Sequence, residues 1–433
     1  MAVSSIYCMY HQASVFHYKG RRLTTYRSMG DAVLGPRGGL AVEVMQFFIN
    51  LGAVITNTIL AGQMLQDVYT SLCTDPSTCR FTSLAAWTAI SGAFSWFLVV
   101  AVRSMSKMKL VGLAAGVAFL VYSASAVGMS AADGVAARAP RDYSAAGGVE
   151  AKWLNALNGV GMLLFQYGVT VLPEIQAVLK DDPKTGNSTP TMIRAAVAAH
   201  LVFVPVFLLV GCVGYWAYGN SVNEFLLFAT TRPAALVAFC NILGVLQLQV
   251  ANQIYALPMF ARLESMIVAK HPRSPWFRSG HLARRREGKA RLAADPAAGK
   301  EDASSAAAAE AIVIEDVPEG QEEGEDGEGE RPQPSWLLQL VHRTAWVAFW
   351  STFAVALPFF AQIMGFFGAV GFGPITYALP TYLYMMAFKE GMPRHKWLFN
   401  AAFVVFWLVA SAAAAVGAVY GIVVAASAHD FFI

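Results

Sequence analysis

Polar side chains inside long apolar runs are the residues of this sequence that could do chemistry. Carboxamides gather in three of these runs, and the run from Asn155 to Leu179 also carries a carboxylate, Glu174. In hydrocarbon such groups need partners, so they should face other helices or a wet cavity. The carboxamides are Asn50, Asn57 and Gln63; Asn155, Asn158 and Gln166; and Asn241, Gln247, Gln249, Asn252 and Gln253. A hydrogen bond between helices, worth about 1 kcal/mol or less, explains any single one, but their clustering favours a polar cavity.

The stretch NGVGMLLFQYGVTVLPEIQAVLK, from Asn158 to Lys180, combines apolar residues with residues that weaken a helix. Gly159, Gly161 and Gly168 tolerate non-helical torsions, and Pro173 has no backbone donor. We therefore predict a broken membrane helix whose freed backbone groups line a solute cavity. The alternative is a packing seam, because small residues let membrane helices approach closely.

The elements that must position these groups are membrane helices. The chain has 433 residues, of which 56% are hydrophobic and 14% charged, whereas soluble domains carry about 25% charged residues. A spanning helix needs about 20 mostly apolar residues, and nine runs meet this need, which predicts an all-α polytopic membrane protein. The runs are Leu40–Gln66, Leu84–Val102, Leu110–Ser130, Asn155–Leu179, Ala195–Tyr218, Leu236–Arg262, Leu337–Phe360, Gly365–Phe388 and Trp397–Ser427.

Basic residues set the predicted orientation, because Lys and Arg are retained in the cytosol. A cytosolic N-terminus places most of the 31 basic residues inside. Cys73 and Cys79 then lie together on the outer side, where a disulfide could persist; the alternative is two independent thiols. Asn187, in the sequence Asn-Ser-Thr, lies on the cytosolic side and should carry no glycan. Glu43 and Arg343 sit near span ends, where long charged side chains can reach water.

Four segments follow from this topology. Residues 1–39 are cytosolic, residues 40–269 hold spans one to six, residues 270–335 form a charged cytosolic loop, and residues 336–433 hold spans seven to nine. The loop is basic at Arg284–Arg291 and acidic at Glu319–Glu330, a composition that cannot bury a core and predicts disorder. It either contacts anionic lipids or proteins or is a solvated linker.

Several strings together resemble the amino acid/auxin permease family, in that family's order and at comparable spacing. The beginning of the chain looks closest to the proline and GABA transporter branch of plants and algae, from YKGRRLTTYRSMGDAVLG (Tyr18–Gly35) and QFFINLGAVITNTILAGQMLQDVY (Gln46–Tyr69). The other strings are VLPEIQAVLK (Val171–Lys180), VGYWAYGNSV (Val213–Val222), QIYALPMFARLE (Gln253–Glu264) and LPFFAQIMGFFGAVGFGPITYALPTYLYM (Leu357–Met385).

The resemblance implies a leucine-transporter-like fold with eleven spans, in which two inverted repeats surround a midplane site with discontinuous helices. It also implies proton-coupled symport of small amino acids, such as proline, GABA or betaine-like compounds, with the plasma membrane as the expected location. On this mapping our nine spans are the family's third to eleventh. Only Ser4–Tyr18 resembles the tail of the second span, so we expect an N-terminally truncated chain that lacks the first span and most of the second.

The candidate substrate site is the predicted break. Backbone and carboxamide groups would bind the ammonium and carboxylate of a zwitterion, and aromatic rings would close over its apolar part. The candidates are Phe165, Gln166, Tyr167 and Gly168 at the break, Asn50 and Asn57 from the first span, and Asn252 from the sixth.

Glu174 is the candidate for proton coupling. It is the carboxylate at the inner end of a span beside the break, and a partly buried Glu can hold a proton. The alternative is a structural role, since an acid in the first turn of a helix interacts favourably with the helix N-terminus.

The sequence points away from other classes of function. We find no metal-ligand cluster, nucleophilic triad, P-loop or dinucleotide pattern, so we expect no enzyme activity, no nucleic-acid partner and no cofactor beyond the coupling proton. The competing hypothesis is a truncated membrane scaffold that does not transport and recruits partners through its charged loop.

Overall fold

The computed structural model describes residues 1–73, 79–102, 108–136, 141–144, 148–182, 186–230, 233–271, 276, 334–357 and 359–428. Most of the predicted loop 270–335, including Arg284–Arg291 and Glu319–Glu330, lies outside these residues. The described part is helical apart from a two-stranded hairpin, so the predicted all-α class is confirmed.

Seventeen segments position the site, and their bounds follow chain order. The first half comprises α1 Ala2–Val15, β1 His17–Tyr18, β2 Arg21–Arg22, α2 Tyr26–Leu34, α3 Pro36–Leu72, α4 Leu84–Ala101, α5 Met108–Ala136, α6 Val149–Gln166 and α7 Leu172–Ala177. The second half comprises α8 Thr189–Tyr218, η2 Gly219–Ser221, η3 Leu226–Ala229, α9 Ala234–Lys270, α12 Trp336–Ala356, α13 Phe360–Phe366, the π-helical η5 Phe367–Ala378 and α14 Leu379–Ala387. After η6 Lys389–Gly391, the helix α15 Arg394–Ala428 ends the described chain.

The hairpin and α2 have local signals in the sequence. Lys19 and Gly20 both have positive φ, 53° and 72°, as a two-residue hairpin turn requires. Thr25 caps α2 by accepting from Ser28 N, and the Ser28 side chain returns a bond to the cap. Gly35, with φ of 80°, ends α2 just before α3 begins.

Seven helical segments among the described residues are long and apolar enough to cross a membrane: α3, α4, α5, α8, α9, the run α13–α14 and α15. The other two predicted spans correspond to α6 with α7, which is interrupted, and to α12, which carries Arg343. The count of nine spans stays a prediction.

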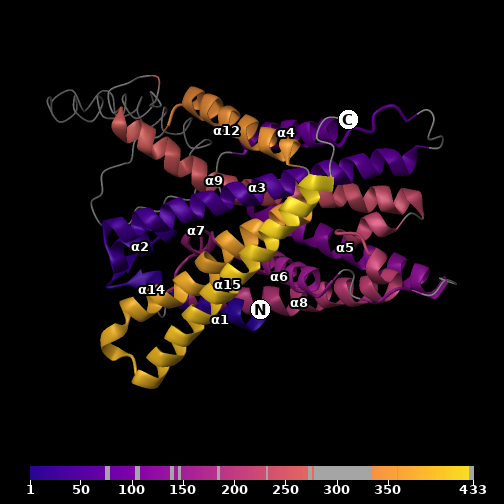
Figure 1. Ribbon diagram of the computed structural model, residues 1–433. Helices are drawn as coiled ribbons and strands as arrows, with labels where there is room; N and C mark the ends of the chain where they lie inside the picture. The colour runs from indigo at the N-terminus through magenta and orange to yellow at the C-terminus, as the bar shows by residue number, and fades with distance from the viewer. Residues whose placement is uncertain are drawn as a thin grey trace.

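The long helices α3 and α9 pack side by side through the molecule, with α4 and α12 on one flank (Figure 1). The interrupted helix α6–α7 lies near the middle, and α15 crosses in front of it diagonally. A core cluster between these helices includes Ile59, Phe260 and Trp350. Large apolar side chains point outward elsewhere, for example Leu201 at 72% exposed, as expected of a surface that faces lipid.

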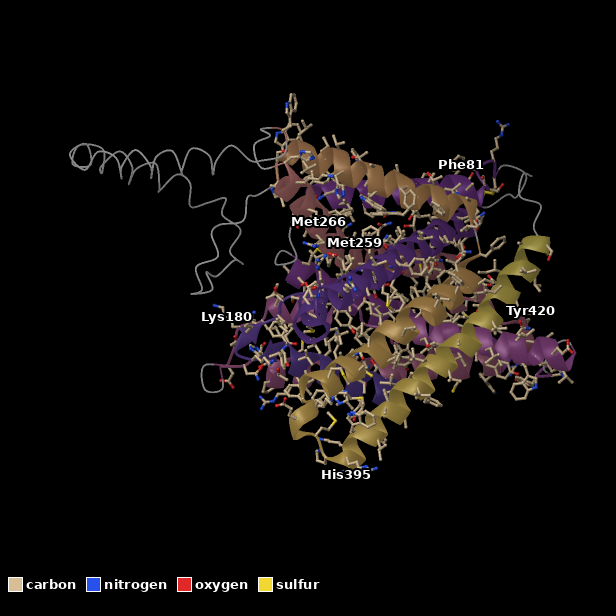
Figure 2. The ribbon with its side chains drawn as sticks, turned by 60° about the vertical axis from the view of Figure 1, so that its left-hand side comes forward. Phe81, Lys180, Met259, Met266, His395 and Tyr420 are labelled. Carbon is tan, nitrogen blue, oxygen red and sulfur yellow. A yellow bond between two sulfur atoms is a disulfide. The ribbon has the colours of Figure 1, made fainter. Side chains whose placement is uncertain are left out.

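The ends of the helices sort as the predicted orientation requires. Figure 2 shows Lys180 and Met266, both predicted to lie toward the cytosol, in one half of the molecule. It shows Phe81 and Tyr420, both predicted to lie toward the outside, in the other half. The arrangement of the helices is therefore compatible with the orientation derived from the basic residues.

Candidate functional site

The helix that carries the candidate site is interrupted. α6 ends at Gln166, residues 167–171 are not helical, and α7 begins at Leu172. Pro173 lies in the first turn of α7, where the missing N–H costs no hydrogen bond. The interruption predicted from the glycines and the proline is confirmed.

Side chains from two other helices hold the backbone that the interruption frees. Gln46 Nε2 on α3 donates to Thr170 O at 2.9 Å, and Ser5 Oγ on α1 donates to Tyr167 O at 3.1 Å. Thr170 Oγ1 donates to Asn50 Oδ1 at 2.8 Å. Because Asn50 and Thr170 are buried, at 1% and 0% exposed, the break forms a polar junction inside the protein.

Glu174 belongs to the same junction. Its Oε1 accepts from Gln46 Nε2 at 3.0 Å and from Tyr26 N at 3.4 Å. Its Oε2 is shielded from solvent and has no hydrogen-bond partner among the described residues. The amide of Gln46 therefore bridges the break, at Thr170 O, to this carboxyl group. Sequence reasoning missed Gln46, although it precedes Asn50 by one helical turn and so shares its face.

Aromatic rings cover the other side of the break. A Cβ built at Gly168 would lie 2.0 Å from Cδ1 of Phe372, so the ring rests directly on the backbone there. The Phe372 ring lies 4.7 Å from that of Phe165 and 6.3 Å from that of Tyr255, centroid to centroid. Sequence reasoning took the glycine-rich run around Phe372 for a helix break between spans, and missed this residue.

The glycines of α6 divide between the two functions considered from the sequence. Gly161 packs against Gly365 and Gly368 so closely that a Cβ at Gly161 would lie 2.4 Å from Gly365 O. This is the close helix approach that small residues allow. Gly168 lies at the break and Gly161 in a packing seam, so both interpretations hold, each for a different residue.

The remaining candidates at the break lie in different surroundings. Tyr167 faces α8, where its ring lies 5.7 Å from Phe207 and 6.4 Å from His200. The side chain of Gln166 is exposed, whereas Asn57 is buried on α3 at 8% exposed. Asn57 lies seven residues beyond Asn50, about two turns along the same face.

Asn252 belongs to a second polar cluster, between α3, α4 and α9. Its Nδ2 lies 3.3 Å from Ser95 Oγ and 3.5 Å from Thr58 Oγ1. Gln249 in turn bonds to Ser95 and to Ser91. Among the hydrogen bonds of the described residues, none joins this cluster to the break, so the structure separates Asn252 from Asn50.

A buried ion pair lies at the cytosolic end of α9 and α12. Arg343 Nε lies 2.8 Å from Glu264 Oε1, and both side chains are 3% exposed. Arg343 Nη1 also donates to Val99 O at 3.0 Å. The expectation that Arg343 reaches water at a span end was wrong, because Glu264 and the last turn of α4 satisfy the guanidinium inside the protein. Glu43 pairs with Arg27 and Arg262.

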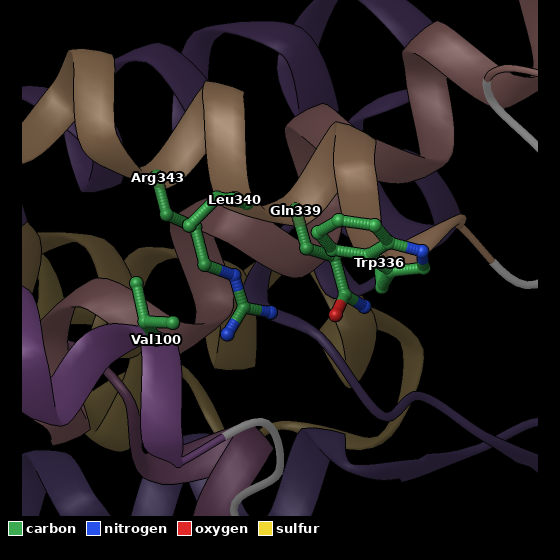
Figure 3. Close-up of a pocket in the computed structure, with 5 residues that line it drawn as sticks. All are labelled: Val100, Trp336, Gln339, Leu340 and Arg343. Atoms are coloured by element: carbon green, nitrogen blue, oxygen red, sulfur yellow. The ribbon is translucent and has the colours of Figure 1, made fainter.

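A small cavity lies beside this ion pair, between α4 and α12. It has a volume of about 120 Å³ and is lined by Val100, Trp336, Gln339, Leu340 and Arg343 (Figure 3). None of these residues belongs to the break, and most of the guanidinium donors of Arg343 are already bonded to protein oxygens. The cavity is thus separate from the candidate site.

Comparison with known proteins decides the family. The sequence profile described as transmembrane amino acid transporter protein matches residues 1–424. The chain belongs to the transmembrane amino acid transporter family. This transporter is accordingly an integral, multi-pass membrane protein of a family of permeases and not of enzymes, and the resemblance seen in the sequence is confirmed.

Three relatives from Arabidopsis thaliana illustrate the match. Lysine histidine transporter-like 6 is 25% identical, over 95% of this chain and 80% of the relative. Lysine histidine transporter-like 3 is 25% identical over 88% and 71%, and GABA transporter 1 is 26% identical over 98% and 80%. These matches extend over almost all of the chain and give no support to the predicted truncation, which stays a prediction.

Two further features concern the predicted site list. Cys73 and Cys79, at the end of α3, are joined by a disulfide. In the described part of the chain, no group of three or more His, Cys, Asp or Glu residues could hold a metal ion.

Proposed function

We propose that this transporter carries small zwitterionic amino acids, such as proline, GABA or betaine-like compounds, in symport with protons. The observation that carries the proposal is the interrupted helix, which brings Gly168 and Thr170 together with Asn50 of α3. An unwound segment in a transporter helix offers backbone groups to a substrate at a depth where they would otherwise be unsatisfied.

The chemistry of the break favours a substrate with a neutral side chain. The groups that meet there are amides, hydroxyls, backbone carbonyls and aromatic rings, and Oε1 of Glu174 already accepts two hydrogen bonds. The ammonium and carboxylate of the substrate would bind to Asn50, Thr170 and the backbone from Gln166 to Gly168. Asn57 would approach from α3, and Phe165 and Tyr167 would cover the apolar part.

We propose Glu174 as the proton carrier. Its Oε2 has no partner among the described residues, so a proton bound there would turn this atom into a donor facing the break. Gln46 links the carboxyl group to Thr170 O, which gives proton binding a direct route to the substrate site. The competing structural role rests on the bonds from Tyr26 N and Gln46 to Oε1; the glutamine variant separates the two, because it keeps an acceptor and removes the acid.

Uptake by the purified protein in liposomes tests the proposal. Labelled proline, GABA or betaine should accumulate when the outside is acidic and fail to accumulate without a pH gradient. Uptake that ignores the gradient would contradict proton coupling, and the absence of binding and uptake for all three would favour the scaffold hypothesis. We also propose the plasma membrane as the location, and anionic lipid or protein as the partner of the loop 270–335.

A further inference from the structure

The ring of Phe372 occupies the space against the broken backbone. Phe372 is 0% exposed, and Cδ1, Cγ and Cε1 of its ring lie 2.0, 2.7 and 2.9 Å from a Cβ built at Gly168. These are the three nearest atoms to that position. Phe165 and Tyr255 complete an aromatic group around the ring. The place where the side chain of a substrate at the break would go is therefore filled by a protein side chain.

The element that carries this ring is irregular. Phe367–Ala378 is π-helical over 12 residues, whereas π-helices are mostly single turns and are frequent at functional sites. Gly368, Gly371, Gly373 and Pro374 lie within it, and these residue types weaken regular helical hydrogen bonding. A turn that changes from π-helical to α-helical bonding alters the direction of the side chains that follow, so Phe372 can leave its position without unfolding of the helix.

The neighbouring contacts also allow such a change. η5 meets α6 through glycines, since a Cβ at Gly368 would lie 1.9 Å from Gly161 O. No side chain of either residue interlocks the two helices there. The backbone of Gly168 is absent from the positive-φ glycines, so it needs glycine for the space that the ring takes and not for its torsion.

We propose that Phe372 is a side-chain gate of the substrate site and sets the largest substrate side chain that the transporter accepts. The inference rests on the proposed function. In this conformation the ring covers the backbone at Gly168, and a bound amino acid displaces it. Small side chains fit with a small displacement, whereas larger ones compete with the ring for the same volume.

Competition uptake with a graded series of amino acids tests the gate. Alanine, proline, valine, leucine and phenylalanine compete with the labelled substrate in the wild type, Phe372→Ala and Phe372→Trp. Phe372→Ala should lower the half-inhibitory concentration of leucine and phenylalanine by about tenfold or more, because filling or emptying a pocket changes discrimination by this order. Phe372→Trp should raise it. Phe353→Ala removes a ring of equal size on α12 that is 43% exposed, and should leave the series unchanged.

A suppressor pair tests the contact itself. Gly168→Ala should abolish uptake, because its methyl group overlaps the Phe372 ring, and the double variant Gly168→Ala/Phe372→Ala should restore it. Gly168→Ala/Phe353→Ala should stay inactive. Where Phe372→Ala does not reach the membrane, Phe372→Leu takes its place in both experiments.

The outcomes separate the gate from the proposed function. If the folded wild type neither binds nor transports any amino acid of the series, the proposed function fails. If the wild type transports but the substrate series is the same in Phe372→Ala, Phe372→Trp and the wild type, the gate is overturned and the transport function stands. Failure of Phe372→Ala to rescue Gly168→Ala, with both proteins folded, also contradicts the gate.

Discussion

Gln46 Nε2 lies 3.0 Å from Glu174 Oε1, and this contact ties the middle of α3 to the short helix that follows the break. The same nitrogen donates to Thr170 O at 2.9 Å. A buried carboxyl group and the carbonyl at the proposed substrate site therefore share one donor. A change at either acceptor alters the bond available to the other, which is the physical basis for coupling a proton to a substrate here.

Glu174→Gln should uncouple uptake from protons. The variant keeps an oxygen that can accept from Gln46 and Tyr26, but it cannot gain or lose a proton. We expect equilibrium binding and exchange of labelled substrate across liposomes to continue, while accumulation driven by a pH gradient disappears. Glu174→Asp retains the acid and serves as the control. Gradient-driven accumulation by Glu174→Gln at the wild-type level would show that Glu174 has a structural role only.

Gln46→Leu should weaken both the fold and uptake. It leaves Thr170 O and Glu174 Oε1 without the amide donor, and a buried polar group that loses its partner costs about 1–3 kcal/mol. Thermal unfolding in detergent should move to lower temperature, together with a loss of substrate binding. Gln63→Leu, about 25 Å further along α3, is the matched control. Equal thermal stability of the wild type and Gln46→Leu would argue against the junction.

The two ion-pair sites at the cytosolic end should differ in their contribution to stability. Arg343→Met leaves the buried carboxylate of Glu264 unpaired, which costs about 3–5 kcal/mol. Replacing both partners by Met should recover most of this loss. Arg262→Ala, at a guanidinium whose side chain is 41% exposed, should cost about 1 kcal/mol or less. Thermal unfolding of the four proteins measures the order, and equal losses for Arg343→Met and Arg262→Ala would contradict it.

Thiol labelling should report the disulfide and the orientation together. In a Cys212→Ser background, which removes the exposed free cysteine, an impermeant thiol reagent should label intact cells only after reduction. The labelled residues should be Cys73 and Cys79, because Cys8 and Cys240 are buried. Labelling before reduction would exclude the disulfide, and labelling only in inverted vesicles would reverse the predicted topology.

Local signals in the sequence carried the prediction of the interruption, because glycine and proline act on the backbone of their own segment. Contacts between distant segments were not predictable in the same way. Phe372 reaches Gly168 only through the packing of η5 on α6. Asn50 and Asn252 are the same residue type in similar apolar runs, yet the rotation of each helix sends one to the break and the other to the Ser95 cluster.

Arg343 shows the same limit for charges. A single arginine near the end of an apolar run looks alike in sequence whether it reaches water or pairs inside the protein. Its partner Glu264 lies 79 residues earlier in the chain, and no local pattern links the two. Burial of the pair depends on α4, α9 and α12 meeting at one end of the molecule.

Equilibrium binding of labelled substrate to folded, purified protein tests most directly whether the break is the substrate site. The comparison uses the wild type, Asn50→Leu and Asn252→Leu, since both asparagines are buried, at 1% and 0% exposed, and only Asn50 contacts the break. We predict that Asn50→Leu weakens binding by about tenfold or more, while Asn252→Leu stays within about twofold of the wild type, less than 0.5 kcal/mol. Equal affinity in the wild type and Asn50→Leu, or a larger loss in Asn252→Leu, would contradict a substrate site at the break.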